Sequence, residues 1–98
     1  GAPAAPHYPL HPSLRSASGG PVELFGELAH PGAIPYAPGI TLTCALRLAG
    51  GTTRLAADVA TLERGDRRWL VPVREIVDGT APDLELAPGD VVTINAIE

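Results

Sequence analysis

The fold is decided by residues 59–73, VATLERGDRRWLVPV, in which two β-prone runs flank the pair Gly65-Asp66. Such a pair between two β-prone runs is typical of a two-residue hairpin turn. The cross-strand pairs then follow: Arg64 with Arg67, Glu63 with Arg68, Leu62 with Trp69, Thr61 with Leu70 and Ala60 with Val71. One face of the hairpin carries Ala60, Leu62, Trp69 and Val71, and the other carries Thr61, Glu63, Arg68 and Leu70. This alternation predicts that Trp69 lies on the apolar face of a sheet.

Upstream of the hairpin, short apolar runs separated by Gly and Pro predict two strands and one helix. Residues 22–28 alternate between apolar and polar positions, as a strand does. Residues 33–36 are restricted to a short or edge strand, because Pro35 cannot donate a backbone hydrogen bond. Thr41 to Ala49 is the predicted helix, capped by Thr41 and ended by Gly50-Gly51. Its buried stripe is predicted to consist of Leu42, Ala45, Leu46 and Ala49.

Downstream of the hairpin, the chain predicts turns, a loop and one final strand. Asp78-Gly79 and Pro88-Gly89-Asp90 are turn signals, and residues 91–97, VVTINAI, are β-branched and free of Pro. A strand of that kind suits the centre of a sheet. The element order is strand, strand, helix, hairpin, loop, strand, which predicts an α+β fold with a mixed sheet curled around one helix.

The first twenty residues differ in texture from the rest of the chain. Pro recurs at positions 3, 6, 9 and 12, and the segment ends in SASGG. These features predict an extended arm or linker over residues 1–20 and a folded domain over residues 21–98. His7, Tyr8 and His11 lie on this arm without a further ligand nearby in sequence, so no metal site is assigned to them.

Composition limits the classes of function. The 98 residues suffice for one domain, and the net charge of −4 with no Lys argues against nucleic acid as a partner. No apolar run approaches the roughly 20 residues that span a bilayer. The single cysteine, Cys44, excludes an intrachain disulfide and a cysteine-based zinc cluster. Cys44 lies beside the apolar stripe of the predicted helix, where a partly buried packing role is expected.

The sequence contains no catalytic pattern. Glu23 and Glu27 share a strand face but lie roughly 13 Å apart along it, too far to infer a two-carboxylate glycosidase. No Ser-His-Asp or metal-ligand pattern stands out, and His30 precedes Pro31 in a predicted turn at the surface. We therefore expect a non-enzymatic protein without a cofactor or metal.

Several motifs in consistent order resemble a known family. They are residues 22–28 (VELFGEL), 30–33 (HPGA), the helix from Thr41-Leu42 to Ala45-Leu46, residues 48–51 (LAGG) and residues 86–92 (LAPGDVV). Together they resemble the SLBB domain, the soluble-ligand-binding β-grasp module. Residues 62–65 (LERG), with Val73, Ile76, Asp78-Gly79 and Asp83-Leu84, look most like the version in bacterial polysaccharide export proteins of the outer membrane. The match covers residues 21–97, and Cys44 departs from the acidic or polar residue common at its position.

The resemblance implies a β-grasp fold and a periplasmic domain of an outer-membrane-associated protein. Such domains help to build exporters of capsule or exopolysaccharide. The implied partners are the passing polysaccharide, other copies of the parent exporter and an inner-membrane co-polymerase. The chain is accordingly expected to be one domain of a larger protein.

The hairpin tip is the concentrated binding feature of the sequence, because Arg64, Arg67, Arg68 and Trp69 gather there on an otherwise acidic chain. Arginines offer several donors to carboxylates and sugar hydroxyls, and an aromatic face can stack on a sugar ring. The alternative is a solvated tip with Trp69 turned into the core. Two further functions remain open: a generic β-grasp module that binds proteins through a strand or sheet face, and a competence-type DNA-uptake relative, which the negative charge disfavours.

Overall fold

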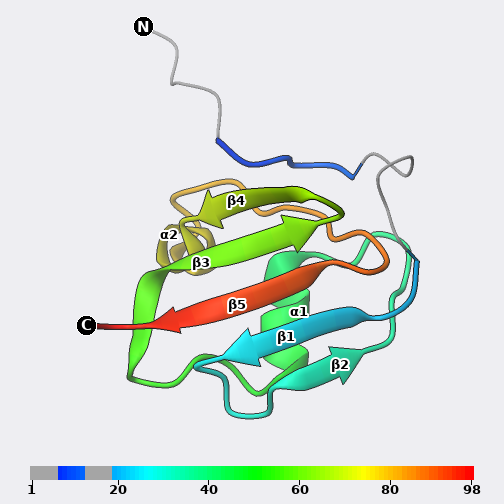
Figure 1. Cartoon of the computed structure of the whole chain (residues 1–98). Coiled ribbons are helices and arrows are strands. Elements are labelled where there is room, and N and C mark those ends of the chain that lie inside the picture. Colours follow the sequence, from blue (N-terminus) through cyan, green and yellow to red (C-terminus); the bar gives the residue numbers. More distant parts are fainter. Residues whose placement is uncertain (1–6, 13–18) are drawn as a thin grey trace, which may run out of the picture.

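The computed structural model describes residues 7–12 and 19–98 (Figure 1). The elements follow in the order β1 (Val22–Gly26), β2 (Gly32–Ile34), α1 (Leu42–Leu48), β3 (Ala56–Arg64), β4 (Arg67–Val71), α2 (Val73–Asp78) and β5 (Val91–Ala96). The described part of the chain is a small α+β domain with five strands and two helices.

The strands form one open mixed sheet in the order β2-β1-β5-β3-β4. β1 and β5 are parallel, and the other neighbours are antiparallel. The predicted mixed sheet is confirmed, as is the central position of the last strand. β2 lies at one edge, as the Pro35 that follows it predicts.

The hairpin of β3 and β4 has the register that the sequence predicts, from Ala60 opposite Val71 to Arg64 opposite Arg67. Gly65 has φ 61°, and Asp66 has a negative φ, so glycine occupies the corner that requires a left-handed backbone, as in a type II′ turn. The second strand ends at Val71, and its predicted extension to Val73 is wrong. Pro72 cannot continue the ladder of hydrogen bonds, and Val73 begins α2.

Helix α1 follows its prediction closely. The Thr41 hydroxyl accepts a hydrogen bond from the Cys44 backbone N–H at 3.3 Å, and Leu42, Ala45, Leu46 and Ala49 are buried. Gly50 follows the helix with φ 81°, a conformation that costs glycine little. The capping residue, the apolar stripe and the terminating glycine are therefore all confirmed.

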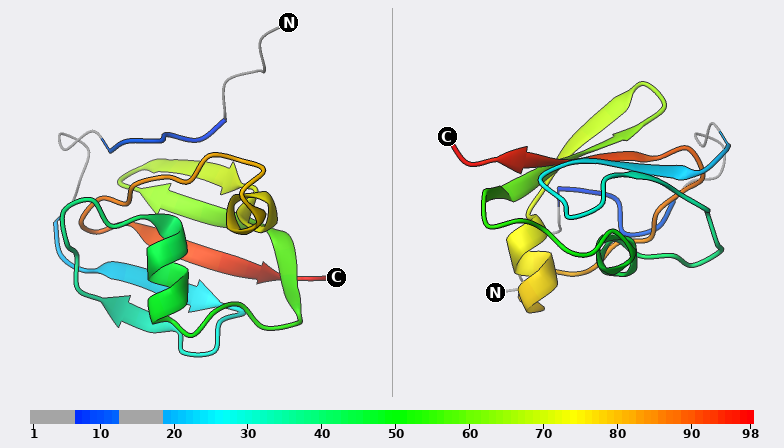
Figure 2. Two further views of the ribbon diagram at one scale, coloured as in Figure 1. Left: turned by 180° about the vertical axis from the view of Figure 1, so that it is seen from behind. Right: turned by 90° about the horizontal axis from the view of Figure 1, so that it is seen from below.

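The expectation of a single helix is wrong, because α2 occupies the segment that the sequence predicted to be loop. Its buried side chains are Val73 and Ile76, and Gly79 ends it with φ 84°. The predicted Asp78-Gly79 turn is thus the end of a short helix. Both helices lie on the same face of the sheet (Figure 2).

The core lies between that sheet face and the helices. Buried sheet residues on the covered face are Val22, Leu24, Ala60, Leu62, Val71, Val92 and Ile94. They pack in one cluster with the buried side chains of α1 and α2 and with Leu84 and Leu86 of the connection to β5. The opposite sheet face is partly apolar, since Phe25 and Leu70 are 44% and 66% exposed there.

Part of the predicted arm lies against the domain. Residues 1–6 and 13–18 lie outside the described residues, whereas Tyr8 belongs to the buried core cluster. The backbone N–H of Glu85 donates to the Leu10 carbonyl at 2.8 Å. The folded unit therefore includes a segment that the sequence analysis placed outside the domain.

Candidate functional site

The hairpin tip brings the four predicted ligand residues into one region but divides them between different environments. In a strand, alternate side chains point to opposite faces. Arg64, Arg67 and Trp69 therefore face the covered side of the sheet, and Arg68 faces the open side. The residues that sequence reasoning grouped as one cluster thus form a buried ion pair, an arginine–tryptophan stack and a surface ion pair.

Arg64 is buried, with only 3% of its side chain exposed, and it is committed to Asp90. Its Nε and Nη2 each lie 2.8 Å from a different carboxylate oxygen of Asp90, a bidentate arrangement. The Asp90 Oδ2 also accepts the Ala87 backbone N–H at 2.8 Å. A buried charge is tolerated when it is paired and hydrogen-bonded in this way. Arg64 therefore joins the end of β3 to the turn before β5 and offers no free donor fork to an external ligand.

Trp69 is half-buried and packs against the core, as its face in the hairpin predicts. Two guanidinium groups lie near its ring, with the Arg64 carbon at 5.7 Å and the Arg67 carbon at 5.2 Å from the ring centroid. Both distances lie within the range of cation–π attraction. The buried Arg64 holds its position through Asp90, whereas Arg67 is exposed and can exchange the ring for another contact.

Arg68 lies on the open sheet face opposite Glu63, and its Nη2 is 3.8 Å from a Glu63 carboxylate oxygen. Both side chains are substantially exposed, so this pair contributes little to stability. The predicted cross-strand pairing of these two residues is confirmed. Because Arg68 and Trp69 point to opposite faces, one small ligand cannot contact both side chains.

The partner of Arg64 was missed at the sequence level. Asp90 was assigned only to the turn before the last strand, yet it is fully buried. Its position directly before the last strand could have identified it, because β5 pairs with β3 and Glu63 lies opposite Val91. Residues 64 and 90 are consequently neighbours across the same pair of strands.

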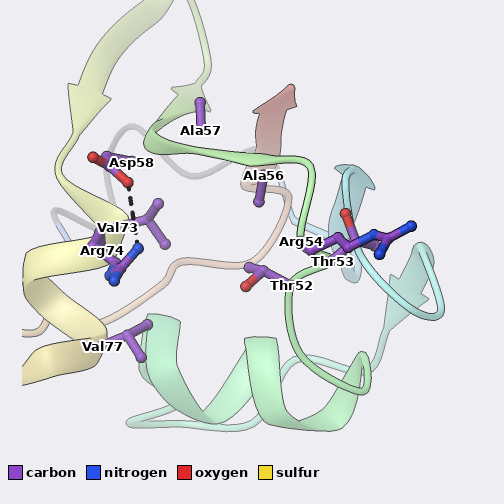
Figure 3. A pocket seen from close by; sticks show the side chains of 9 residues that line it. All are labelled: Thr52, Thr53, Arg54, Ala56, Ala57, Asp58, Val73, Arg74 and Val77. Atoms are coloured by element: carbon purple, nitrogen blue, oxygen red, sulfur yellow. Dashed lines mark ion pairs between the residues drawn. The ribbon is translucent and has the colours of Figure 1, made fainter. Parts of the chain in front are cut away.

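A small groove lies between α2 and the start of β3, lined by Thr52, Thr53, Arg54, Ala56, Ala57, Asp58, Val73, Arg74 and Val77 (Figure 3). Its volume is about 150 Å³, below the range of pockets that enclose drug-sized ligands. Arg74 and Asp58 form an ion pair across it at 3.7 Å, while the Arg54 side chain points away from that pair. Arg74 also lies 3.5 Å from Asp78. The groove thus carries a guanidinium that carboxylates already neutralise.

The remaining reactive side chains are dispersed. Cys44 is exposed on α1, so the expectation of partial burial is wrong; its position beside the stripe places it on the solvent side of the helix. His11 lies 3.2 Å from Glu85. Among the residues that the structure describes, no three His, Cys, Asp or Glu side chains gather as a metal site would require.

No protein-family model matches this chain, and no curated protein matches it significantly. In the described ranges 7–12 and 19–98, no helix is long and apolar enough to cross a membrane. Any assignment of a family or a function to this chain therefore depends on its residues and on their geometry.

Proposed function

We propose that this domain is a β-grasp module of the SLBB type and acts as a non-catalytic, periplasmic part of a bacterial outer-membrane exporter of capsule or exopolysaccharide. In this role it contacts neighbouring copies of the exporter and an inner-membrane co-polymerase, and it touches the passing polysaccharide weakly. The predicted ligand contact is narrowed to Arg67 and Trp69.

Two features support the proposed β-grasp fold: the arrangement of the sheet, and two glycines, Gly26 and Gly50, in the motifs that resemble the SLBB domain. The parallel β1–β5 pair at the centre, flanked by antiparallel strands and crossed on one face by α1, is an arrangement that suits a β-grasp. A Cβ atom on Gly26 would collide with the Ile94 carbonyl oxygen, and one on Gly50 would lie 2.9 Å from Ala29 and His30. Gly26 and Gly50 therefore lie where segments of the domain approach closely, whereas a Cβ on Gly32 or Gly51 would meet nothing within 4 Å.

The ligand part is carried by one observation: Arg67 is exposed beside the half-buried ring of Trp69. Among the ion pairs of the described residues, Arg67 has no carboxylate partner. A planar guanidinium binds carboxylates through two parallel hydrogen bonds, and an aromatic ring beside it offers apolar contact to a sugar. This combination favours acidic saccharides over neutral ones.

The proposal is tested by titrating the ¹⁵N-labelled protein with acidic and with neutral oligosaccharides while following the Trp69 indole and the amide of Arg67. We expect saturable shifts with the acidic set, with a dissociation constant of about 1 mM for a contact of this size. Arg67→Ala should weaken the binding at least about fivefold, since a charged hydrogen-bond donor is lost. Arg68→Ala is the matched control, because it removes the same charge from the opposite face.

Two results would contradict the ligand contact. One is an absence of shifts at millimolar acidic oligosaccharide, and the other is equal weakening by Arg67→Ala and Arg68→Ala, which would indicate nonspecific charge attraction. Either result would leave the function of the domain in its contacts with other proteins.

A generic protein-interaction module is the second candidate, and the open sheet face favours it. Phe25 and Leu70 are exposed and lie in one row across the sheet, joined through Thr93 and Thr61. Half-exposed apolar residues on a sheet face can contact a protein partner. Under this alternative Phe25→Ser should abolish partner binding while leaving oligosaccharide titrations unchanged.

A further inference from the structure

Residues 7–12 run alongside the connection between α2 and β5, as the views in Figures 1 and 2 agree. Tyr8 is only 6% exposed, and its hydroxyl donates to the Pro82 carbonyl at 2.6 Å. Leu10 packs against the core, and its carbonyl accepts the Glu85 N–H. The contacts link residues more than seventy positions apart in the chain. They define a docked segment, residues 7–12, and a docking edge, residues 82–86.

The docking edge is an extended piece whose other side is already paired. The Leu86 N–H donates to the Ile40 carbonyl at 2.8 Å, and the Leu42 N–H donates to the Leu84 carbonyl at 2.9 Å. Successive N–H groups of extended chain point in opposite directions, so the Glu85 N–H points away from that pairing. The docked segment satisfies this donor. Without it, the edge would expose an unpaired backbone group next to apolar core residues.

The docked segment suits recognition as a short peptide. Pro9 and Pro12 have a restricted φ, so the segment loses less conformational entropy on docking than a chain without proline. Tyr8 supplies a large apolar ring with one polar end, a common anchor in interfaces. His11 adds a side-chain contact to Glu85 at 3.2 Å. Recognition of the docking edge therefore depends mainly on residues 8–10, Tyr-Pro-Leu.

We propose that the docking edge is an interaction site for residues 7–12 of a second copy of this chain, so that neighbouring copies exchange their docked segments. Exchange of an identical element keeps every contact of the monomer and is a low-cost route to association. Gly19 and Gly20 precede β1 with φ 82° and 89°, and a Cβ added to either would meet nothing within 4 Å. Glycine populates positive and negative φ about equally, so the backbone at these two residues has other conformations available at little cost.

Mass action determines when exchange occurs. Because residues 7–12 belong to the same chain as the docking edge, they reach it at an effective concentration of about 1 mM. Exchange between free molecules therefore requires millimolar protein, whereas copies fixed side by side reach that local concentration. The association of copies in an exporter rests on the proposed function, but exchange itself is a property of this chain and can be tested without saccharide.

Two variants of the whole 98-residue chain remove the competition from each molecule's own docked segment. Tyr8→Ala weakens the docked segment and leaves the docking edge intact. Glu85→Pro removes the N–H that donates to the Leu10 carbonyl. The hydrogen bonds that join Leu84 and Leu86 to Leu42 and Ile40 are retained. ¹⁵N-labelled Tyr8→Ala protein is titrated with unlabelled Glu85→Pro protein, and the amides of residues 81 and 83–86 are followed.

We expect saturable shifts at the Glu85 amide with a dissociation constant below about 1 mM, because the competing segment of the same molecule has been weakened. Unlabelled protein carrying both substitutions is the matched control and should produce none. If Glu85→Pro protein does not fold, a synthetic peptide of residues 5–13 replaces it, with the same peptide carrying Ala for Tyr8 as control. No shifts at several millimolar donor, or equal shifts with the control, would overturn the proposal. A failed oligosaccharide titration leaves it unaffected.

Discussion

At the residue scale, the buried ion pair of Arg64 and Asp90 joins the end of β3 to the turn before β5. Charge alone makes an arginine at a hairpin tip look exposed. The alternation of the hairpin places Arg64 on the covered face, and Asp90 arrives beside it from a turn 26 residues later. The same alternation correctly predicts the half-buried position of Trp69. The local pattern thus determines the face of each side chain, whereas the identity of its partner depends on the order of the strands.

Removing one partner of this pair should destabilise the domain strongly. Asp90→Asn keeps the size of the side chain but leaves a buried guanidinium unpaired, at a cost of about 3–5 kcal/mol in the free energy of unfolding. Urea denaturation measures that change. Arg68→Ala is the control, because its partner Glu63 is exposed and such pairs contribute about 1 kcal/mol or less. A loss below about 1 kcal/mol for Asp90→Asn would mean that the pair is hydrated in solution.

At the element scale, the parallel pair of β1 and β5 depends on one glycine. Gly26 has φ 92°, and its missing side chain allows the backbone of Ile94 to approach. A glycine inside a strand pattern is typical of a bulge, a bend or a close backbone approach, and Gly26 makes such an approach. Helix α2 was missed for the opposite reason. It has six residues, no side-chain cap at Pro72 and three β-branched residues, so its propensity is weak and its stability comes from burying Val73 and Ile76.

Gly26→Ala and Gly39→Ala separate backbone strain from steric collision. Both positions have a positive φ, so both substitutions should cost about 1–2 kcal/mol of strain. A Cβ at Gly39 meets nothing within 4 Å, whereas one at Gly26 collides with the Ile94 carbonyl. We therefore expect Gly26→Ala to destabilise by at least about 2 kcal/mol more than Gly39→Ala, because the central strands must move apart. Equal midpoints in urea denaturation would show that β1 and β5 adjust freely at this position.

At the scale of the whole molecule, the docked segment extends the folded unit toward the N-terminus. Tyr8 is buried against residues that follow it by more than seventy positions. Burial raises the pKa of Tyr8, and the negative charges of Asp83 and Glu75 raise it further. The docked state therefore favours the neutral phenol. The contribution of Tyr8 to stability is fully present below its ordinary pKa of 10.0 and is lost as the pH rises through the raised value.

Alkaline titration should reveal this docking. Near-ultraviolet absorbance of the native protein should contain a phenol that ionises above pH 10.0, and this component should be missing from Tyr8→Phe protein. Above pH 10.0 the stability of the native protein should also fall relative to that of Tyr8→Phe, which cannot ionise. If the Tyr8 component titrates at its ordinary pKa, the segment is undocked in solution, and the exchange proposed for it has no structural basis.

Features that depend on neighbours along the chain are predictable from the order of the residues. The hairpin register and the ends of α1 follow from turn and capping residues, and the central position of β5 follows from its β-branched sequence without Pro. The burial of Arg64 with Asp90, the formation of α2 and the docking of Tyr8 depend on the assembled fold. Each of these joins segments that are distant in sequence or depends on burial against them. Local propensity carries no information about such partners, because the contacts between them stabilise the protein only when the whole sheet has assembled.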